Sequence, residues 1–180
     1  MLELRNQLAT SLLEAYTANF DITPITDDTS LFARCDYHSR DAQYVLIRKA
    51  ELWASENHEY LYLHNLSTAN ISVVDKIMQD TLTDGEPRII PHAQHMFTHL
   101  SAVILCDQID SDTIAHLKSM KKHRSFWLSL HGWMEFKIAV VDVTTGQIFT
   151  NRAGKQLAAD LNSFVTKELK LFYKREENTK

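Results

Sequence analysis

The chain has 180 residues, of which 44% are hydrophobic and 23% are charged, and its formal net charge is −4. That length and composition are typical of one globular domain with a sizeable core. The acidic balance argues against a protein whose main task is to grip a nucleic-acid backbone, so we expect no nucleic-acid partner.

The first half of the chain predicts two helices around a group of strands. Leucines at helical spacing indicate an amphipathic helix over residues 2–16, followed by a connection at 20–28. A second helix is predicted at 71–82 and should end at Gly85. Apolar and β-branched runs between the two helices indicate strands joined by polar turns: strands 31–37, 43–54 and 60–63, turns 38–41 and 55–58.

The second half centres on residues 124–160, where the apolar runs and the turn residues are clearest. Before it, a strand is predicted at 99–107 and a short helix at 111–122, while residues 89–98 fit no single element. A last helix should begin near Asn151, a residue suited to an N-cap. Within the central stretch we expect three strands, of which the middle one is covered on both faces: 126–131, 136–143 and 147–150.

The resulting element order is α-β-β-β-α-β-α-β-β-β-α. It predicts an α+β fold with a mostly antiparallel sheet flanked by helices. We expect a single domain over residues 1–173 and a polar C-terminal tail at 174–180. No stretch approaches the ~20 apolar residues of a membrane span, and the N-terminus lacks a signal-peptide pattern, so we expect a cytoplasmic protein without a membrane partner.

Both cysteines, Cys35 and Cys106, fall in predicted strands. Buried free thiols are the commonest state of such residues in a cytoplasmic protein. Sequence spacing does not supply the geometry of a disulfide, so the redox state of the two cysteines stays open at this point.

Three histidines, His92, His95 and His99, have the spacing i, i+3 and i+7. On a helix they would share one face, and three neutral imidazoles make a good zinc site. If a strand begins near His95 instead, then His95 and His99 share a face with Phe97, and His92 points elsewhere. Polar or capping roles are the alternative for all three.

Glu135 and Lys137 form an E-x-K motif on a predicted strand. Nucleases of the PD-D/ExK type use such a pair, the carboxylate to hold a divalent cation and the lysine to stabilise developing charge. The α-β-β-β-α-β order of the first half is similar to that fold, but the motif lies in the second half. Asp107 could supply a further carboxylate. The alternative is that strand alternation places both motif residues on a solvent-exposed face.

A group of basic side chains also lies close together along the chain: Lys118, Lys121, Lys122, His123 and Arg124. Such a patch can attract an anion even in an acidic protein. Cations also suit the C-terminal end of a helix, and we favour that interpretation of the patch.

Two segments carry a family resemblance: PHAQHM at residues 91–96, and residues 132–154, which begin with GW and end with TNRAG. Together they resemble a family of small bacterial proteins, a domain of unknown function, over residues 44–154. The resemblance implies no activity, cofactor or catalytic residue. It marks six positions for attention, for which turn geometry, capping and core packing are the alternative roles: His95, Met96, Gly132, Trp133, Asn151 and Gly154.

We expect a non-catalytic binding or protein-interaction module, because no nucleophile, acid–base pair or phosphate-binding loop stands out. An exposed strand or an aromatic surface would let it self-associate as a homodimer. No cofactor is predicted. The alternative is a metal-dependent hydrolase or nuclease, which would need a divalent cation held by the histidines or by the E-x-K motif with Asp107.

Overall fold

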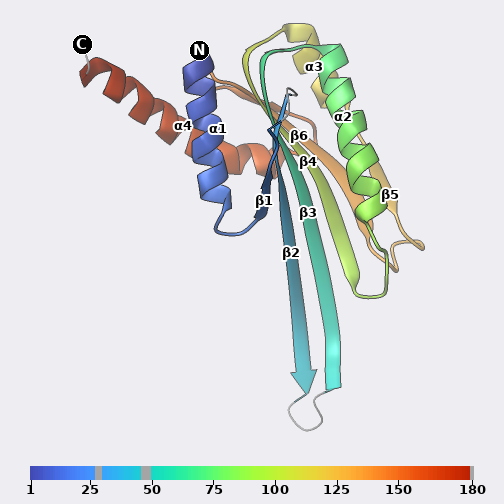
Figure 1. Ribbon diagram of the computed structural model, residues 1–180. Helices are drawn as coiled ribbons and strands as arrows, with labels where there is room; N and C mark the ends of the chain where they lie inside the picture. The colour runs from blue at the N-terminus through green and yellow to red at the C-terminus, as the bar shows by residue number, and fades with distance from the viewer. Residues whose placement is uncertain (27–29, 46–49, 179–180) are drawn as a thin grey trace.

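The computed structural model describes residues 1–26, 30–45 and 50–178 (Figure 1). Within these residues, seven strands form one mixed sheet in the order β1-β2-β3-β4-β6-β5, and β7 also pairs with β6. β4 is parallel to both of its neighbours, β3 and β6, whereas every other pairing is antiparallel. The predicted α+β fold with a mostly antiparallel sheet flanked by helices is confirmed.

The elements have the following bounds. The strands are β1 Asp21–Pro24, β2 Leu31–Val45, β3 Ala50–Ala69, β4 His95–Ile109, β5 His123–Ser125, β6 Trp133–Asp142 and β7 Ile148–Thr150. The helices are α1 Leu2–Tyr16, α2 Ile71–Gly85, α3 Ser111–Ser119 and α4 Lys155–Asn178, with a short 3-10 helix, η1, at Glu86–Arg88.

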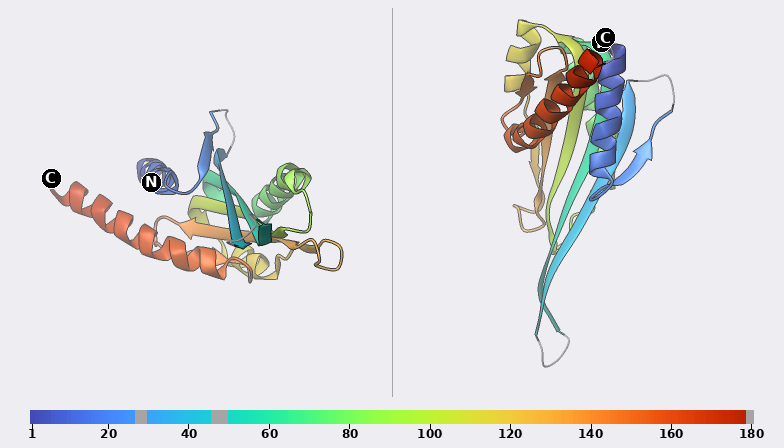
Figure 2. Two further views of the ribbon diagram at one scale, coloured as in Figure 1. Left: turned by 90° about the horizontal axis from the view of Figure 1, so that it is seen from below. Right: turned by 90° about the vertical axis from the view of Figure 1, so that its left-hand side faces the viewer.

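Helices cover both faces of the sheet. α2 and α3 pack against one face, and α1 and α4 pack against the other (Figure 2). The middle strands β4 and β6 are therefore buried on both sides, which confirms the predicted strand at 136–143. On β6, Phe136 and Ile138 face α2 and α3, whereas Ala139 and Val141 face α1 and α4. A parallel strand enclosed in this way reads as an unbroken apolar run, which is why its position is visible in the sequence.

The predicted turns at 38–41 and 55–58 are wrong, because these polar segments lie inside β2 and β3, where His38 pairs with His58. The β3–β4 pairing begins only at Glu56, so the rest of the β2–β3 pair projects beyond the sheet as a two-stranded ribbon (Figure 1). The polar residues at 38–41 pair with those at 55–58 across the two strands and do not interrupt the pairing, so their polarity was not a turn signal. β1 was missed altogether, because it lies in the predicted connection at 20–28.

The predicted strand at 126–131 is also wrong, since these residues form the loop between β5 and β6. Trp127, Leu128 and Ser129 have φ angles of 48°, 52° and 68°, so the chain turns in the left-handed region. Trp127 and Leu128 are 74% and 96% exposed. The apolar alternation that resembled a half-buried strand is therefore an apolar loop.

The last helix differs from its prediction at both ends. It begins at Lys155, after a turn that follows Asn151, and it continues to Asn178, past residue 173. In the part of the chain that the structure describes, no helix combines the length and apolar character needed to cross a membrane.

Candidate functional site: a cation-lined notch beside β6

The outer edge of β6 is shared by two short strands that leave a gap between them. β5 pairs with Trp133–Glu135 and β7 pairs with Ala139–Val141. The three residues between these pairings, 136–138, pair with β4 on the inner edge but have no strand on the outer edge, so their outward-pointing main-chain groups need other partners. The amide of Phe136 donates to the carbonyl oxygen of Lys122 at 2.9 Å, which meets part of this need.

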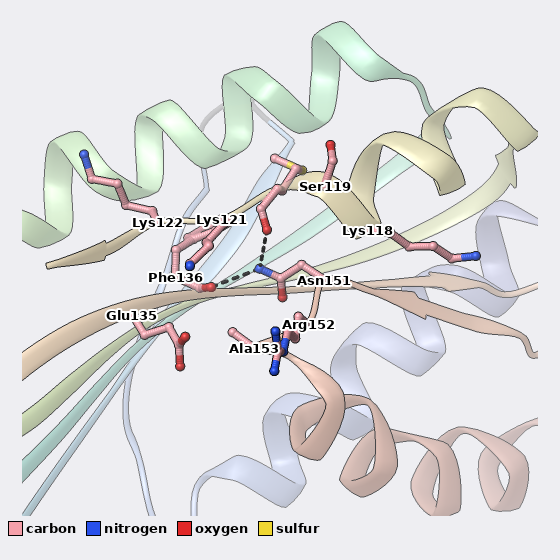
Figure 3. A pocket seen from close by; sticks show the side chains of 10 residues that line it. Lys118, Ser119, Lys121, Lys122, Glu135, Phe136, Asn151, Arg152 and Ala153 are labelled. Carbon is pink, nitrogen blue, oxygen red and sulfur yellow. Dashed lines mark hydrogen bonds between the residues drawn. The ribbon is translucent and has the colours of Figure 1, made fainter.

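The side chain of Asn151 fills the rest of the gap. Its amide nitrogen donates to the carbonyl oxygens of Phe136 and Met120 at 3.0 and 3.3 Å. Its amide oxygen accepts from the main-chain N–H groups of Ile138 at 3.3 Å and Gly154 at 2.9 Å, the latter as in an N-cap (Figure 3). Asn151 is 1% exposed, and its side-chain amide donates two hydrogen bonds and accepts two. It thus takes the place that a neighbouring strand would have along this part of β6.

Gly154 lets α4 begin directly against β6. A Cβ atom at this position would lie 2.2 Å from Thr150 Oγ1 and 2.8 Å from the carbonyl oxygen of Ile138. Thr150 Oγ1 in turn donates to the carbonyl oxygen of Ile138 at 2.6 Å. The turn from Thr150 to Gly154 therefore fixes the position of the first turn of α4 relative to the gap in β6.

A pocket of about 550 Å³ opens at this gap, and we call it the β6 notch. Four cations and one carboxylate are among the residues that line it: Lys118, Lys121, Lys122, Arg152 and Glu135. Figure 3 shows Arg152 and Glu135 on the same side of β6 as the start of α4. Lys122 forms an ion pair with Glu86, with Nζ 3.7 Å from Oε1. The other three cations, Lys118, Lys121 and Arg152, make no hydrogen bond or ion pair with any other residue that the structure describes.

The start of α4 adds to the positive potential of the β6 notch. α4 has 24 residues and no acidic residue in its first turn, so no carboxylate there neutralises the positive end of the helix dipole. The lining of the notch thus combines Asn151, which is fixed by its hydrogen bonds, with four cationic side chains. This arrangement can hold an anion, and it contains no metal-binding group of three ligands among the described residues.

The three predicted metal ligands do not converge. A bulge at Met96 shifts the register between β3 and β4, so that His95 and His99 lie on opposite faces of the sheet, and the predicted shared face is wrong. His95 is 3% exposed and uses both ring nitrogens, Nδ1 with the carbonyl oxygen of His131 at 2.7 Å and Nε2 with Thr98 Oγ1 at 2.9 Å. His92 pairs with Glu56 at 3.1 Å.

His99 lies instead beside Lys137 on the face of α1 and α4, where Nζ of Lys137 is 2.8 Å from Nδ1 of His99. Burial, aided by the charge of Lys137, lowers the pKa of His99 to about 3, so its imidazole is neutral at pH 7. Burial also lowers the pKa of Lys137, against the opposing charges of Glu59, Glu135 and Asp160. The lysine of the E-x-K motif therefore contacts a neutral histidine, and Glu135 lies opposite that histidine on the neighbouring strand.

Asp107 has a structural partner and is separate from the E-x-K motif. It forms an ion pair with Arg5 of α1, which is 6% exposed and also donates to Asn65. The pair fastens α1 to the end of β4. The proposed set of Asp107 with Glu135 and Lys137 is therefore not assembled at one place.

The remaining predicted positions have roles in packing and turns. Gly132 has a φ of +76°, and a Cβ atom there would lie 2.4 Å from the carbonyl oxygen of Met96. Trp133 stacks on Phe97 with ring centroids 5.3 Å apart. Cys35 and Cys106, whose redox state the sequence left open, are free and buried, and burial raises the pKa of each thiol to about 12.

Comparison with protein families gives one match, which covers most of the chain. A family model described as a domain of unknown function (DUF8052) matches residues 5–163. The chain belongs to this family. The resemblance to a domain family of unknown function is thus confirmed, and membership of DUF8052 brings no activity with it. Neither the curated proteins nor the solved structures hold a match to the chain.

The sequence did not reveal the β6 notch of this DUF8052 domain as a site. The lysines were visible as a patch, but Arg152 lies 30 positions after Lys122 and joins them only through the fold. A usable signal was present in Asn151 and Gly154, a capping residue and a glycine that flank Arg152 and Ala153. It predicted the turn but not the cations across from it.

Proposed function

We propose that this domain is a non-catalytic binding module and that the β6 notch holds a small phosphate-bearing anion. The observation that supports this is the set of three cations, Lys118, Lys121 and Arg152, that surround a pocket of about 550 Å³ without a described partner. In a chain with a net charge of −4, these cations create a local field of the opposite sign.

Binding is favoured over catalysis by the chemistry of the lining. Asn151 has all its hydrogen-bonding groups engaged, and the Ser119 hydroxyl donates to the carbonyl oxygen of His116 at 2.7 Å. Glu135 is the one carboxylate among the lining residues, so the notch holds no acid–base pair. The metal-dependent hydrolase draws no support from the three histidines, because His92 and His95 have ring centroids 6.3 Å apart but His99 lies on the opposite face of the sheet.

The expected affinity is modest. Exposed charge pairs contribute about 0.2–1 kcal/mol each, and the helix end adds a similar amount. Three such contacts and the helix end, acting on an anion in a preformed pocket, total at most ~4 kcal/mol, which corresponds to a dissociation constant on the order of 1 mM at low salt. Higher ionic strength should weaken the complex, because the rim is solvent-exposed.

Calorimetric titration with pyrophosphate tests the proposal. Replacing Lys121 and Arg152 together by Gln should weaken binding by about tenfold or more, since two direct contacts to the anion are lost. The matched control replaces Lys167 and Lys170, two exposed lysines further along α4, and should leave the affinity within about twofold. No binding at millimolar pyrophosphate, or an equal loss in both variants, would rule the notch out.

We further propose that the domain self-associates through the apolar loop at residues 126–132. On this loop, the exposed fractions of Trp127, Leu128 and Leu130 are 74%, 96% and 71%. Contact of so much apolar surface with water is unfavourable, and a second copy of the chain could cover it. Light scattering after size exclusion should show a dimer that Leu128→Ser with Leu130→Ser converts to a monomer. The control is Ile71→Ser, at an exposed apolar position on α2. A wild-type monomer at high concentration would refute self-association.

A further inference from the structure

A second cavity, of about 760 Å³, lies between α2 and the β2–β3 hairpin, and we call it the α2 groove. α2 packs on β3 and β4, and the groove is lined by residues of α2 together with residues of β2 and β3. Five aliphatic side chains are among the residues that line it, one from just after β1 and the others from β2, β3 and α2: Ile25, Leu31, Leu66, Val73 and Ile77. Its volume is within the range of small-molecule sites, about 300–1,000 Å³.

Thr81 of α2 brings an unsatisfied hydroxyl to this lining. The residue is 1% exposed, and its Oγ1 atom has no hydrogen-bond partner in the part of the chain that the structure describes. A threonine inside a helix commonly donates to the carbonyl oxygen one turn earlier, and Thr81 does not. Buried polar groups are nearly always paired, so this hydroxyl indicates a missing partner.

The other buried polar groups of the α2 groove already have partners. The Tyr62 hydroxyl donates to Asp84 at 2.6 Å, and Nδ1 of His64 is 3.2 Å from Ser30 Oγ. Burial lowers the pKa of His64 to about 4, with Asp80 opposing this shift, so the imidazole is neutral at pH 7. Thr81 is thus the lining group that still needs a hydrogen bond.

The charges around the α2 groove cancel in pairs. Arg34 lies 3.2 Å from Asp84, and Lys76 forms an ion pair with Asp80 one helical turn away. Two cations thus face two carboxylates at the rim of an apolar cavity. A charged ligand would have to break one of these pairs, whereas an uncharged ligand leaves both in place. The rim therefore selects for a ligand without net charge.

We infer that the α2 groove binds an uncharged amphiphile, an aliphatic body with one hydroxyl or carbonyl group that hydrogen-bonds to Thr81. This site is independent of the β6 notch: it uses β2, β3 and α2, whereas the notch uses β6, the end of α3 and the start of α4. The two sites also differ in chemistry, because the notch is cationic and the α2 groove is electrically balanced.

Titration with 1-octanol and octanoate, which differ in the charge of the head group, tests this inference. Nuclear magnetic resonance shifts of the α2 amides report binding at the groove. We expect octanol to bind about tenfold more tightly than octanoate. Thr81→Val removes the hydroxyl at constant shape and should weaken octanol binding by about five- to tenfold, whereas Thr81→Ser should retain it. Val73→Phe should fill the groove and abolish binding.

The matched control is Thr113→Val, which alters a buried threonine of α3 outside the α2 groove. It should leave the octanol affinity unchanged, and thermal melts of all the variants confirm that each is folded at the titration temperature. The inference fails if Thr81→Val binds octanol as tightly as the wild type, if Val73→Phe still binds it, or if octanoate binds as well as octanol. Pyrophosphate affinity should be the same in all these variants, which separates this test from that of the notch.

Discussion

The side-chain amide of Asn151 donates to the carbonyl oxygen of Phe136 at 3.0 Å, in the gap that β5 and β7 leave along β6. A side chain thus completes a sheet edge that two strands share. Because the same residue also caps the turn before α4, the sheet edge, the start of α4 and the end of α3 meet at one amide. The shape of the β6 notch depends on this single residue.

Asn151→Ala should therefore destabilise the fold strongly. Three main-chain groups, those of Phe136, Met120 and Ile138, lose their partner in a buried place, whereas the Gly154 N–H keeps the main-chain carbonyl of residue 151. Each unsatisfied group costs about 1–3 kcal/mol before relaxation or water entry. We expect the free energy of unfolding in urea to fall by roughly 3 kcal/mol or more. Asn162→Ala, at an exposed position on α4, is the control and should change it by less than ~0.5 kcal/mol. A similar small change for Asn151→Ala would show that water replaces the amide without cost.

Gly132→Ala should also be destabilising, for two reasons. The residue has a φ of +76°, where an alanine is strained by about 1 kcal/mol, and its Cβ atom would approach the carbonyl oxygens of Met96 and His95 to 2.4 and 2.5 Å. Since both obstacles are main chain, β4 and β6 would have to separate locally. We expect a loss of about 2 kcal/mol or more in the free energy of unfolding. Near-wild-type stability would mean that the bulge at Met96 moves freely.

The parts of the fold that sequence predicts are those where one physical cause dominates. β4 and β6 are apolar on both faces, and Leu100 and Phe136 are fully buried, so burial alone marks these strands. The same reasoning fails for the polar segments of β2 and β3 and for the loop at 126–132. His38 and His58 are polar but pair across two strands, whereas Leu128 is apolar but 96% exposed.

The candidate sites depend on contacts that sequence does not encode locally. Arg152 joins Lys121 at the notch only because the turn between β7 and α4 passes beside β6. Thr81 belongs to a helical stripe whose periodicity predicts burial, but no pattern indicates that its hydroxyl lacks a partner. Spacing also misled: one extra residue at Met96 reversed the relation of His95 to His99.

Stability should decline in acid because His64 is kept neutral by burial. Its pKa is about 4 in the folded chain and 6.5 as the reference value. Between these two pH values the unfolded chain binds more protons than the folded chain, so the free energy of unfolding falls as the pH falls. The stability is therefore undiminished by His64 above pH 6.5 and declines as the pH is lowered toward 4. At ~1.4 kcal/mol per pKa unit, the loss is on the order of 3 kcal/mol.

His64→Gln isolates this contribution. We expect the wild type to lose stability more steeply than the variant between pH 7 and pH 4.5, as measured by urea unfolding at each pH. Above pH 7 the two curves should run parallel, since the imidazole is neutral in both states there. Parallel curves over the whole range would mean that His64 does not supply the slope.

Lys137→Met should raise the pKa of His99. The charge of Lys137, 2.8 Å away, adds to burial in lowering that pKa to about 3, so removing the charge leaves only the effect of burial. Nuclear magnetic resonance titration of the imidazole protons measures the change. Lys170→Met, at the far part of α4, is the matched control. An unchanged His99 titration in Lys137→Met would show that burial alone sets the pKa.

Arg5→Met should be costly because it leaves Asp107 without its cation. Arg5 is 7% exposed at its side chain and Asp107 18%, and the second carboxylate oxygen of Asp107 is buried with no hydrogen-bond partner among the described residues. Breaking such a pair on one side typically costs about 3–5 kcal/mol, whereas replacing both partners by apolar residues can be nearly neutral. We expect Arg5→Met to lose about 3 kcal/mol and the double variant with Asp107→Leu to recover most of it. A double-mutant cycle in urea measures the coupling, and additive losses would show that the pair does not fasten α1 to β4.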